Sequence, residues 1–172
     1  MIEVERKYRG TPAAVEAVTA LADSTGERVQ QTDLYLNAPD RDFAVTDEAL
    51  RIRSTTPAEG DTRVAITYKG PRATTAEKAR TEHEVGVETL GTTAVIFEAL
   101  GYTEVARVTK QRQRWRWADL EVAIDTLAGG ERYIELEQTV DAAEAVAAAD
   151  ATLADRAAQL GLSTSELEPR SY

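Results

Sequence analysis

Most of this chain alternates between apolar and polar residues with a period of two. In IEVERKY (residues 2–8), Glu3, Glu5 and Lys7 fall on one side, while Ile2 and Val4 fall on the other. Such alternation is typical of half-buried β-strands. It predicts strands over 2–9, 28–37, 48–56, 62–69, 81–89, 104–117, 119–127 and 131–139.

Three segments carry helix signals instead, because each starts at a residue that can cap a helix. We predict helices over 11–26, 92–101 and 140–161, with N-caps at Thr11, at Thr92 or Thr93, and at Asp141. Their Pro, Gly and Asp content predicts loops at 37–42 and 69–78.

The predicted order is strand, helix, four strands, helix, three strands and helix, with no linker between them. Short connections between consecutive strands favour antiparallel pairing, which indicates an α+β fold. The 172 residues, 42% of them hydrophobic, suit one domain with its own core. We therefore predict a single domain over 1–172.

Composition excludes several chemistries. The chain has no cysteine, which excludes disulfides, thiolate zinc sites and cysteine nucleophiles. Its one histidine, His83, falls on the apolar side of a predicted strand, so we expect a packed residue rather than a base or ligand. A histidine triad or zinc centre is therefore not expected.

The chain shows no signal for membrane or nucleic-acid partners. It has no apolar run of about 18 residues, and the charged start MIEVERK is unlike a signal peptide. A net charge of −10 argues against a general nucleic-acid binder. We expect a cytoplasmic protein, and a homodimer if the chain self-associates.

The polar sides of the predicted strands are mainly charged. For one strand alone, a solvent-facing sheet with surface ion pairs is the simpler interpretation. For the whole set it is weaker, because Ser, Asn and Gln are scarce there. The charged positions include Glu3, Glu5, Lys7, Arg51, Arg53, Lys69, Glu82, Glu84, Lys110, Arg112, Arg114, Glu121, Asp125, Glu135 and Glu137.

These side chains would share a cavity if the sheet curled into a barrel with the charged sides inward. Arginine forks and lysine point charges suit the oxygens of a polyanion. Carboxylates suit hard divalent cations, which also bind phosphate. The combination predicts a metal–polyphosphate site, although YKGPR lacks the spacing of a P-loop.

The motifs in order resemble those of CYTH-domain proteins, the triphosphate tunnel metalloenzymes. The E-x-E-x-K motif is present as Glu3, Glu5 and Lys7, followed by QTDLYL (31–36) and the R-x-R of Arg51 and Arg53. Further matches are Lys69, Glu82 with Glu84, Lys110 with Arg112, Asp125, and Glu135 with Glu137.

This resemblance implies an eight-stranded antiparallel β-barrel, open as a tunnel, with helices packed outside and with Mg²⁺ or Mn²⁺ as cofactor. It implies that the triphosphate is bound by Lys7, Arg51, Arg53, Lys69, Lys110 and Arg112. The implied metal residues are Glu3, Glu5, Asp125, Glu135 and Glu137, and Glu82 and Glu84 either bind metal or support residues that do. Glu3, Glu5, Lys7 and Lys69 are the implied catalytic residues.

Three functions are compatible with such a site. The first is a class IV adenylyl cyclase, which converts ATP to cyclic AMP and pyrophosphate. The second is a triphosphatase acting on thiamine triphosphate or inorganic triphosphate. The third is a non-catalytic polyphosphate-binding barrel, against which the carboxylate pairs argue.

The cationic positions lead to an expectation about stability. Like charges gathered in one cavity repel each other, so a polyanion should stabilise the protein. On this basis Arg53→Ala is expected to leave the empty protein as stable as the wild type.

The surface composition generates a prediction about salt. Only 4 of the 20 basic residues are lysine, in an acidic and alanine-rich chain, which indicates adaptation to high salt; GC-rich codon bias is the alternative. Because salt screens the repulsion among surface carboxylates, we expect the melting temperature to rise from dilute buffer to molar KCl. A melting temperature that is flat or falls with KCl in calorimetry would contradict the adaptation.

Overall fold

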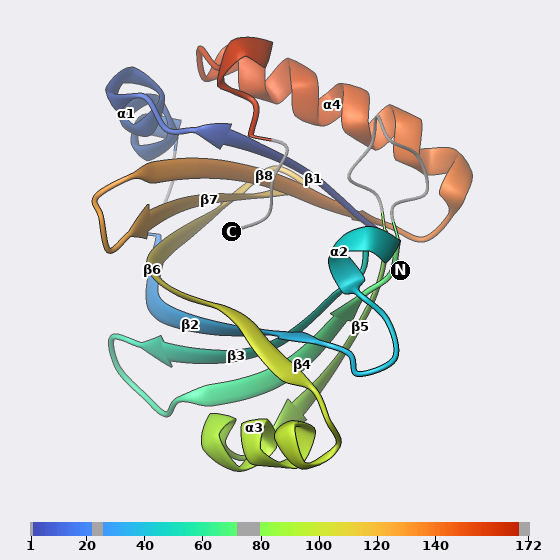
Figure 1. The fold of residues 1–172 in the computed structure, drawn as a ribbon. Helices are drawn as coiled ribbons and strands as arrows, with labels where there is room; N and C mark the ends of the chain where they lie inside the picture. Colours follow the sequence, from blue (N-terminus) through green and yellow to red (C-terminus); the bar gives the residue numbers. More distant parts are fainter. Residues whose placement is uncertain (1, 22–25, 72–79, 169–172) are drawn as a thin grey trace.

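The computed structural model describes residues 2–21, 26–71 and 80–168, and eight strands form its centre (Figure 1). They are β1 (Ile2–Arg9), β2 (Glu27–Asn37), β3 (Ala49–Pro57), β4 (Arg63–Lys69), β5 (Arg80–Val87), β6 (Thr103–Trp117), β7 (Leu120–Leu127) and β8 (Arg132–Val140). The predicted strands are thus confirmed, with ends that differ by one or two residues.

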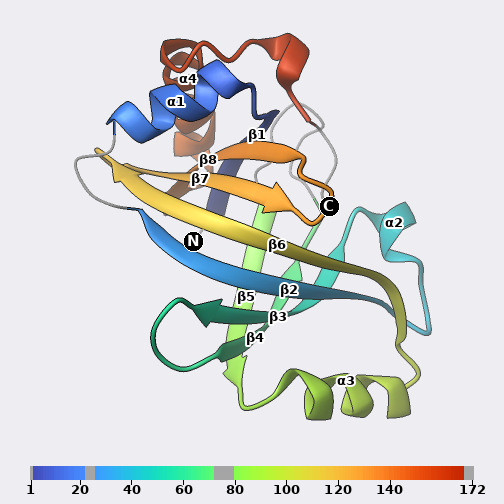
Figure 2. The ribbon, with the colours of Figure 1, turned by 90° about the vertical axis from the view of Figure 1, so that its left-hand side faces the viewer.

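The strands pair in the order β1-β5-β4-β3-β2-β6-β7-β8 and close into a barrel in which every pair is antiparallel. Figures 1 and 2 show the barrel as two curved sheets, joined where β6 crosses beside β2. The predicted eight-stranded antiparallel barrel of an α+β protein is confirmed.

Closure is uneven around the barrel. Strands β1 and β5 share only two residue pairs, Ile2 with Thr81 and Glu3 with Arg80. Further along β1, Tyr8 forms a bridge with Leu167, and the backbone N–H of Glu168 donates to the Lys7 carbonyl at 2.8 Å. The edge of β1 that β5 leaves open is therefore partly covered by the segment after the last helix.

The apolar sides of the strands face outward, where helices cover them in two separate cores. Helices α1 (Pro12–Leu21) and α4 (Val146–Gln159) pack on the sheet of β1, β7 and β8. The first core contains Val4, Ile134, Leu136 and Leu153, among other buried residues. Since the helices bury the outer surface, the inner surface remains for polar groups.

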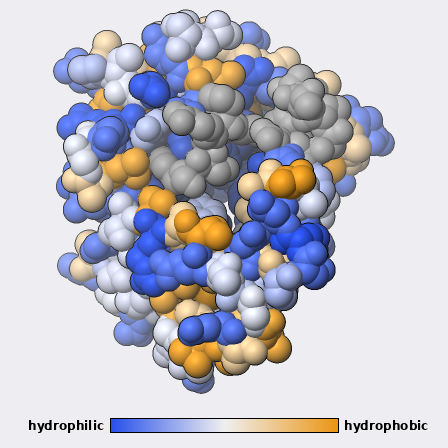
Figure 3. Space-filling view, viewed as in Figure 1, coloured by the Kyte–Doolittle hydropathy of each residue, from blue (hydrophilic) through white to orange (hydrophobic). Residues whose placement is uncertain are grey.

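The second core lies on the outer surface of β2, β3 and β4. Leu34, Leu50 and Ile52 are buried there with Phe43 of α2 (Phe43–Thr46), and Phe97 of α3 (Leu90–Ala99) packs against them. In the view of Figure 3, hydrophobic groups also appear on the surface at the end formed by α3. They include exposed side chains of this helix and of the next strand, namely Val95, Ile96, Leu100 and Val105.

The helices match the prediction in place but not always in their caps. The hydroxyl of Thr11 accepts from the backbone N–H of Ala14 at 3.2 Å, as an N-cap should. Helix α3 is capped by Thr89, whose hydroxyl accepts from the N–H of Thr92 at 3.2 Å, so the predicted caps at Thr92 or Thr93 are wrong.

The third helix also begins later than predicted. A short 3₁₀ turn, η1 (Ala143–Ala145), precedes α4 and has Ala142 at its N-cap position, so the predicted cap at Asp141 is wrong. A second 3₁₀ turn, η2 (Thr164–Glu166), follows α4. Helix α2 was not predicted; it is capped by Asp42, whose carboxylate accepts from the N–H of Ala44.

His83 and the predicted loop 69–78 differ from expectation or lie outside the described residues. His83 is exposed on the outer surface of β5 and stacks on Tyr68, with 6.5 Å between ring centroids, so its expected burial is wrong. Among the described residues, no helix covers the outer surface of β5 around His83, where Val85 is 58% exposed. Most of the predicted loop 69–78 lies outside the described residues.

Within residues 2–21, 26–71 and 80–168, no helix combines the length and apolar character required to cross a membrane.

Candidate active site

The barrel encloses a cavity of about 540 Å³ that is lined almost entirely by charged side chains. Among the lining residues, eight are cationic and seven are carboxylates. Twelve of the thirteen predicted site residues line it: Glu3, Glu5, Lys7, Arg51, Arg53, Lys69, Glu82, Glu84, Lys110, Arg112, Glu135 and Glu137. The inward placement that the alternation predicted is therefore confirmed for these twelve.

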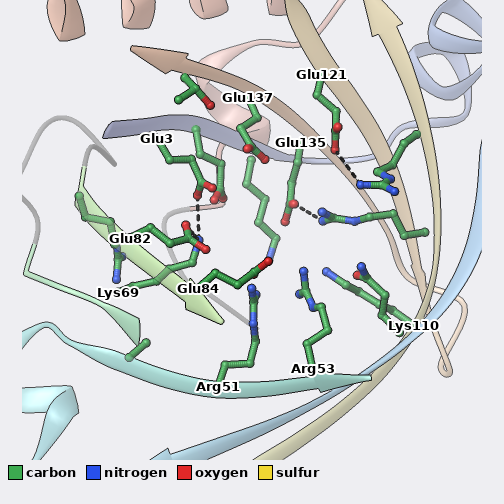
Figure 4. A pocket seen from close by; sticks show the side chains of 18 of the residues that line it. Glu3, Arg51, Arg53, Lys69, Glu82, Glu84, Lys110, Glu121, Glu135 and Glu137 are labelled. Atoms are coloured by element: carbon green, nitrogen blue, oxygen red, sulfur yellow. Dashed lines mark hydrogen bonds and ion pairs between the residues drawn. The ribbon is translucent and has the colours of Figure 1, made fainter. Parts of the chain in front are cut away.

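Two groups of opposite charge face each other across the cavity. In Figure 4, Glu3, Glu121, Glu135 and Glu137 point inward from β1, β7 and β8, whereas Arg51, Arg53 and Lys110 point toward them from β3 and β6. The pairing register creates this separation, because Glu5 lies opposite Glu137 and Glu137 opposite Glu121 across three neighbouring strands. We call these two surfaces the acidic wall and the basic wall.

The basic wall is held in place by buried aspartates. Asp33 of β2 is fully buried, and its two oxygens accept from Nε and Nη2 of Arg53 at 2.6 Å each. Burial would raise the pKa of Asp33, but the hydrogen bonds and charge of Arg53, with Arg51 and Lys110 further away, hold this pKa below its ordinary value. The carboxylate is therefore charged and fixes the Arg53 fork.

Asp125 of β7 has the same role for the other half of this wall. It is fully buried and accepts from Nε and Nη2 of Arg112 and from Nζ of Lys110, each at 2.6 Å. It does not line the cavity, unlike the carboxylates with which it was predicted to bind metal. The structure thus places Asp125 behind the cations as their counter-charge.

Arg51 is held less firmly than Arg53. Its Nη2 donates to the hydroxyl of Thr67 at 3.3 Å, and that hydroxyl donates to Glu84 at 3.0 Å. The Nε of Arg51 is buried and has no hydrogen-bond partner among the described residues. A buried donor without a partner is costly, so Arg51 is suited to donate a hydrogen bond to an incoming anion.

Charge compensation changes one expectation. Arg53 was expected to be removable without a cost in stability, because cations in one cavity repel. Since Arg53→Ala would leave the fully buried Asp33 without its partner, we now expect a loss of about 3–5 kcal/mol, as for other broken buried pairs.

The acidic wall is crowded by like charges. Burial, together with the charges of Glu3, Glu121 and Glu5, raises the pKa of Glu137 to about 9. Glu135 differs, because the charges of Arg112, Lys110 and Lys7 outweigh the effect of burial and keep its pKa below the ordinary value. The crowding is therefore greatest around Glu137.

Two lysines lie close to the carboxylates of the acidic wall. Lys69 Nζ lies 2.8 Å from Glu3 and 2.9 Å from Glu82. Lys7 is 2% exposed and its Nζ lies 4.7 Å from the centre of the Tyr133 ring. These ammonium groups interrupt the acidic side and bring positive charge close to its carboxylates.

The acidic wall suits a divalent ion that is only partly bound by protein. Among the described residues, no three His, Asp or Glu side chains form a group that could hold a metal ion. Mg²⁺ commonly binds through one or two carboxylates, with water and substrate phosphates completing its shell. The crowded oxygens of Glu3, Glu5 and Glu137 fit that mode, whereas a complete protein cage does not.

Several lining residues were given no role in the site from sequence, although Arg114 and Glu121 were expected to face the cavity. They are Gln31, Tyr35, Ala49, Arg80, Arg114, Glu121 and Thr139. The signal for Gln31, Asp33 and Tyr35 was present in QTDLYL, where they alternate with Leu34 and Leu36. Their odd positions in this alternating stretch place them on the inner side of β2. Across the β2–β3 pair, Tyr35 lies opposite Arg51 and Asp33 lies opposite Arg53.

A closed antiparallel barrel with an acidic and a basic wall defines the class of triphosphate tunnel proteins. The CYTH domain family model matches residues 1–172, and the chain belongs to this family. The resemblance drawn from its motifs is therefore confirmed. At the level of the family, the prediction of an enzyme is confirmed as well, and the matching relatives bear adenylate cyclase names.

Individual relatives agree with this assignment. MJ0240 of Methanocaldococcus jannaschii, named as a candidate adenylate cyclase, is 37% identical over 142 residues, covering 81% of this chain and 78% of that protein. Adenylate cyclase CyaB of Aeromonas hydrophila is 29% identical over 175 residues, covering 99% and 86%. The solved structure of PH1819 from Pyrococcus horikoshii is 31% identical, with a TM-score of 0.92 over 99% of this chain and 95% of that one. CYTH triphosphate tunnel enzymes generally depend on a divalent metal ion.

The crowding around Glu137 generates a prediction. Because the pKa of Glu137 is raised to about 9 in the crowded row of Glu5, Glu137 and Glu121, this carboxyl must take up a proton when the protein folds near pH 7. Glu137→Gln removes that cost, so in EDTA near pH 7 we expect a higher melting temperature, by roughly 2–4 °C for each kcal/mol recovered. Glu98→Gln, at an exposed position on α3, is the control and should leave the melting temperature unchanged. A lower melting temperature for Glu137→Gln would show that the row is not repulsive.

Proposed function

We propose that this protein is a metal-dependent enzyme that acts on a triphosphate substrate, with class IV adenylyl cyclase as the first activity. The observation that carries the proposal is the pair of facing walls in one cavity. The cations suit phosphate oxygens, and the carboxylates suit a divalent ion bound to the same phosphates. The cyclase names of MJ0240 and CyaB support this choice.

In this proposal the basic wall binds the phosphate chain. Arg53 is already oriented by Asp33, so its remaining N–H groups can donate to non-bridging oxygens without reorganisation, and Asp125 fixes the guanidinium of Arg112 beside it. Arg51 and Lys110 add further donors, and Lys7 and Lys69 bring charge from the opposite side. Such preorganised donors stabilise the charge that develops on phosphate oxygens in the transition state.

Glu3, Glu5, Glu135 and Glu137 would hold Mg²⁺ or Mn²⁺, with Glu82 and Glu84 close by. The bound ion would neutralise phosphate charge and align the reacting groups. Glu135 already contacts Arg112. It therefore joins the metal side of the site to the phosphate side.

In the cyclase reaction, the ribose 3′ oxygen of ATP attacks the α-phosphorus and loses its hydroxyl proton to water. The bond from this phosphorus to the oxygen that bridges to the β-phosphorus then breaks, and pyrophosphate leaves with that electron pair. The wall of Arg51, Arg53 and Lys110 would bind the leaving pyrophosphate as charge accumulates on it.

A triphosphatase is the second candidate, and the cavity lining favours it in one respect. Of the lining residues in the described part of the chain, four are uncharged, namely Gln31, Tyr35, Ala49 and Thr139. Pockets that bind organic groups are usually lined by apolar and aromatic side chains. A site with so few of them suits recognition through phosphates alone, as expected for inorganic triphosphate.

One experiment separates these activities. Purified protein in molar KCl, with Mg²⁺ or Mn²⁺, is offered ATP, thiamine triphosphate and tripolyphosphate, and the products are identified. We expect cyclic AMP and pyrophosphate from ATP; inorganic phosphate from any of the three would support the triphosphatase instead.

The metal role has its own test. The double variant Glu3→Gln, Glu5→Gln should lose turnover and keep its fold, because amides are poor ligands for hard cations. Circular dichroism checks the fold, and Glu98→Gln again serves as the control. Full activity of the double variant, or of the wild type in EDTA, would remove the metal from the proposal.

Phosphate binding is tested by thermal stability. Tripolyphosphate with Mg²⁺ should raise the wild-type melting temperature, since a ligand that binds the folded state stabilises it. Arg51→Ala should lose most of this shift with little change in the empty protein, because its Nε has no partner among the described residues. The control is Arg107→Ala, which removes an exposed arginine outside the cavity. If calorimetry detects no binding of any triphosphate to the wild type, the proposed function is wrong.

A further inference from the structure

Asp33 lies behind the basic wall and was given no role from the sequence, although it belongs to the QTDLYL motif. It lies on β2 opposite Arg53 of β3 and is fully buried, behind the arginine and away from the cavity surface. Both of its oxygens are used by Arg53, at 2.6 Å each. A bidentate pair of this kind fixes both the position and the plane of the guanidinium.

The neighbouring arginine provides a comparison within the same strand. Arg51 projects into the cavity two residues earlier, yet its Nη2 has only a long contact of 3.3 Å to Thr67, and its Nε has no partner among the described residues. One arginine of the R-x-R pair is thus fixed in advance, while the other has N–H groups to spare. The position opposite Arg53 on β2 carries the carboxylate of Asp33, whereas the position opposite Arg51 carries the phenol of Tyr35, which cannot form a bidentate pair.

We propose that Asp33 is a positioning residue for this site, which orients the Arg53 guanidinium so that its free N–H groups meet the phosphate oxygens without reorganisation. This inference rests on the proposed function, because it assigns to Arg53 a triphosphate ligand. Preorganisation of a binding group increases affinity by removing the cost of ordering it on binding.

A positioning role and a purely electrostatic role of Asp33 predict opposite changes in affinity. Asp33 is a negative charge close to an anion site, so its neutralisation makes the site more positive and, by electrostatics, should tighten binding of a polyanion. Loss of positioning should weaken binding instead. Asp33→Asn therefore separates the two effects by the sign of the change in affinity.

The central experiment measures tripolyphosphate affinity by calorimetry in Mg²⁺, well below each variant's melting temperature. We expect Asp33→Asn to bind about tenfold more weakly than the wild type. In the Arg53→Ala background, Asp33→Asn should cause no further loss of affinity, because it acts through Arg53. Loss of affinity from Asp33→Asn that persists without Arg53 would indicate a structural role and overturn the proposal.

The chain offers a matched control. Glu48 likewise accepts from both Nε and Nη2 of an arginine, Arg41, at 2.8 and 2.9 Å, but this pair lies outside the cavity. Glu48→Gln also breaks a bidentate pair and can lower stability, yet it should leave the affinity for tripolyphosphate unchanged.

A measurement on the wild type covers the case in which a variant does not fold. Nuclear magnetic relaxation of the arginine Nε–H groups reports how ordered each guanidinium is. We expect Arg53 to be ordered in the free protein and unchanged by tripolyphosphate, whereas Arg51 becomes ordered only on binding. An Arg53 as mobile in the free protein as the exposed Arg107 would overturn the proposal.

The outcomes distinguish this inference from the proposed function. If the wild type binds no triphosphate, both the proposed function and the role of Asp33 are wrong. If the wild type binds, and Asp33→Asn binds as tightly or more tightly, only the positioning role of Asp33 is wrong.

Discussion

Pairing of buried charge is the constraint on which the rest of this structure depends. A barrel interior with eight cations and seven carboxylates is stable only if most of them have partners, because an isolated buried ion is very costly. Asp33 and Asp125 meet this need from behind the basic wall. Glu3 and Glu82 meet it for Lys69.

The apolar cores follow from the same constraint. Since the barrel interior is occupied by charge, hydrophobic stabilisation must come from its outer surface, where α1 and α4 cover one part and α3 covers another. Ile52, for example, is completely buried in the core on the outer side of the barrel. Its packing fixes the position of β3, whose inner side carries Arg51 and Arg53. Packing outside and precise placement of charge inside are therefore two effects of one alternating sequence.

Alternation predicted the strands and the inward placement of twelve site residues, because a period of two decides which side chains share a face. It could not show which cations are paired. The contact between Asp33 and Arg53 depends on the register of β2 against β3, and this register is set by a connection that contains the unpredicted helix α2. The same limit explains Asp125, whose partners lie on β6.

The exposure of His83 shows a second limit. The sequence identified its face correctly, but whether a helix covers that face depends on the path of α3, which packs near the end of β5 at Val87 and leaves His83 and Val85 exposed. Similarly, Thr89 caps α3 because the chain turns into the helix two residues before the predicted start. Tertiary path, rather than local pattern, decides such details.

The uneven closure of the barrel has a mechanical consequence. Strands β2 and β6 share eleven residue pairs, whereas β1 and β5 share two, and neither apolar core spans the β1–β5 junction. If the two sheets move apart, the β2–β6 ladder acts as the hinge and the β1–β5 junction is the line that parts, with little loss of hydrogen bonding. Glu3 lies on that line, paired with Arg80, so any such widening alters the acidic wall first and leaves the clamped arginines in place.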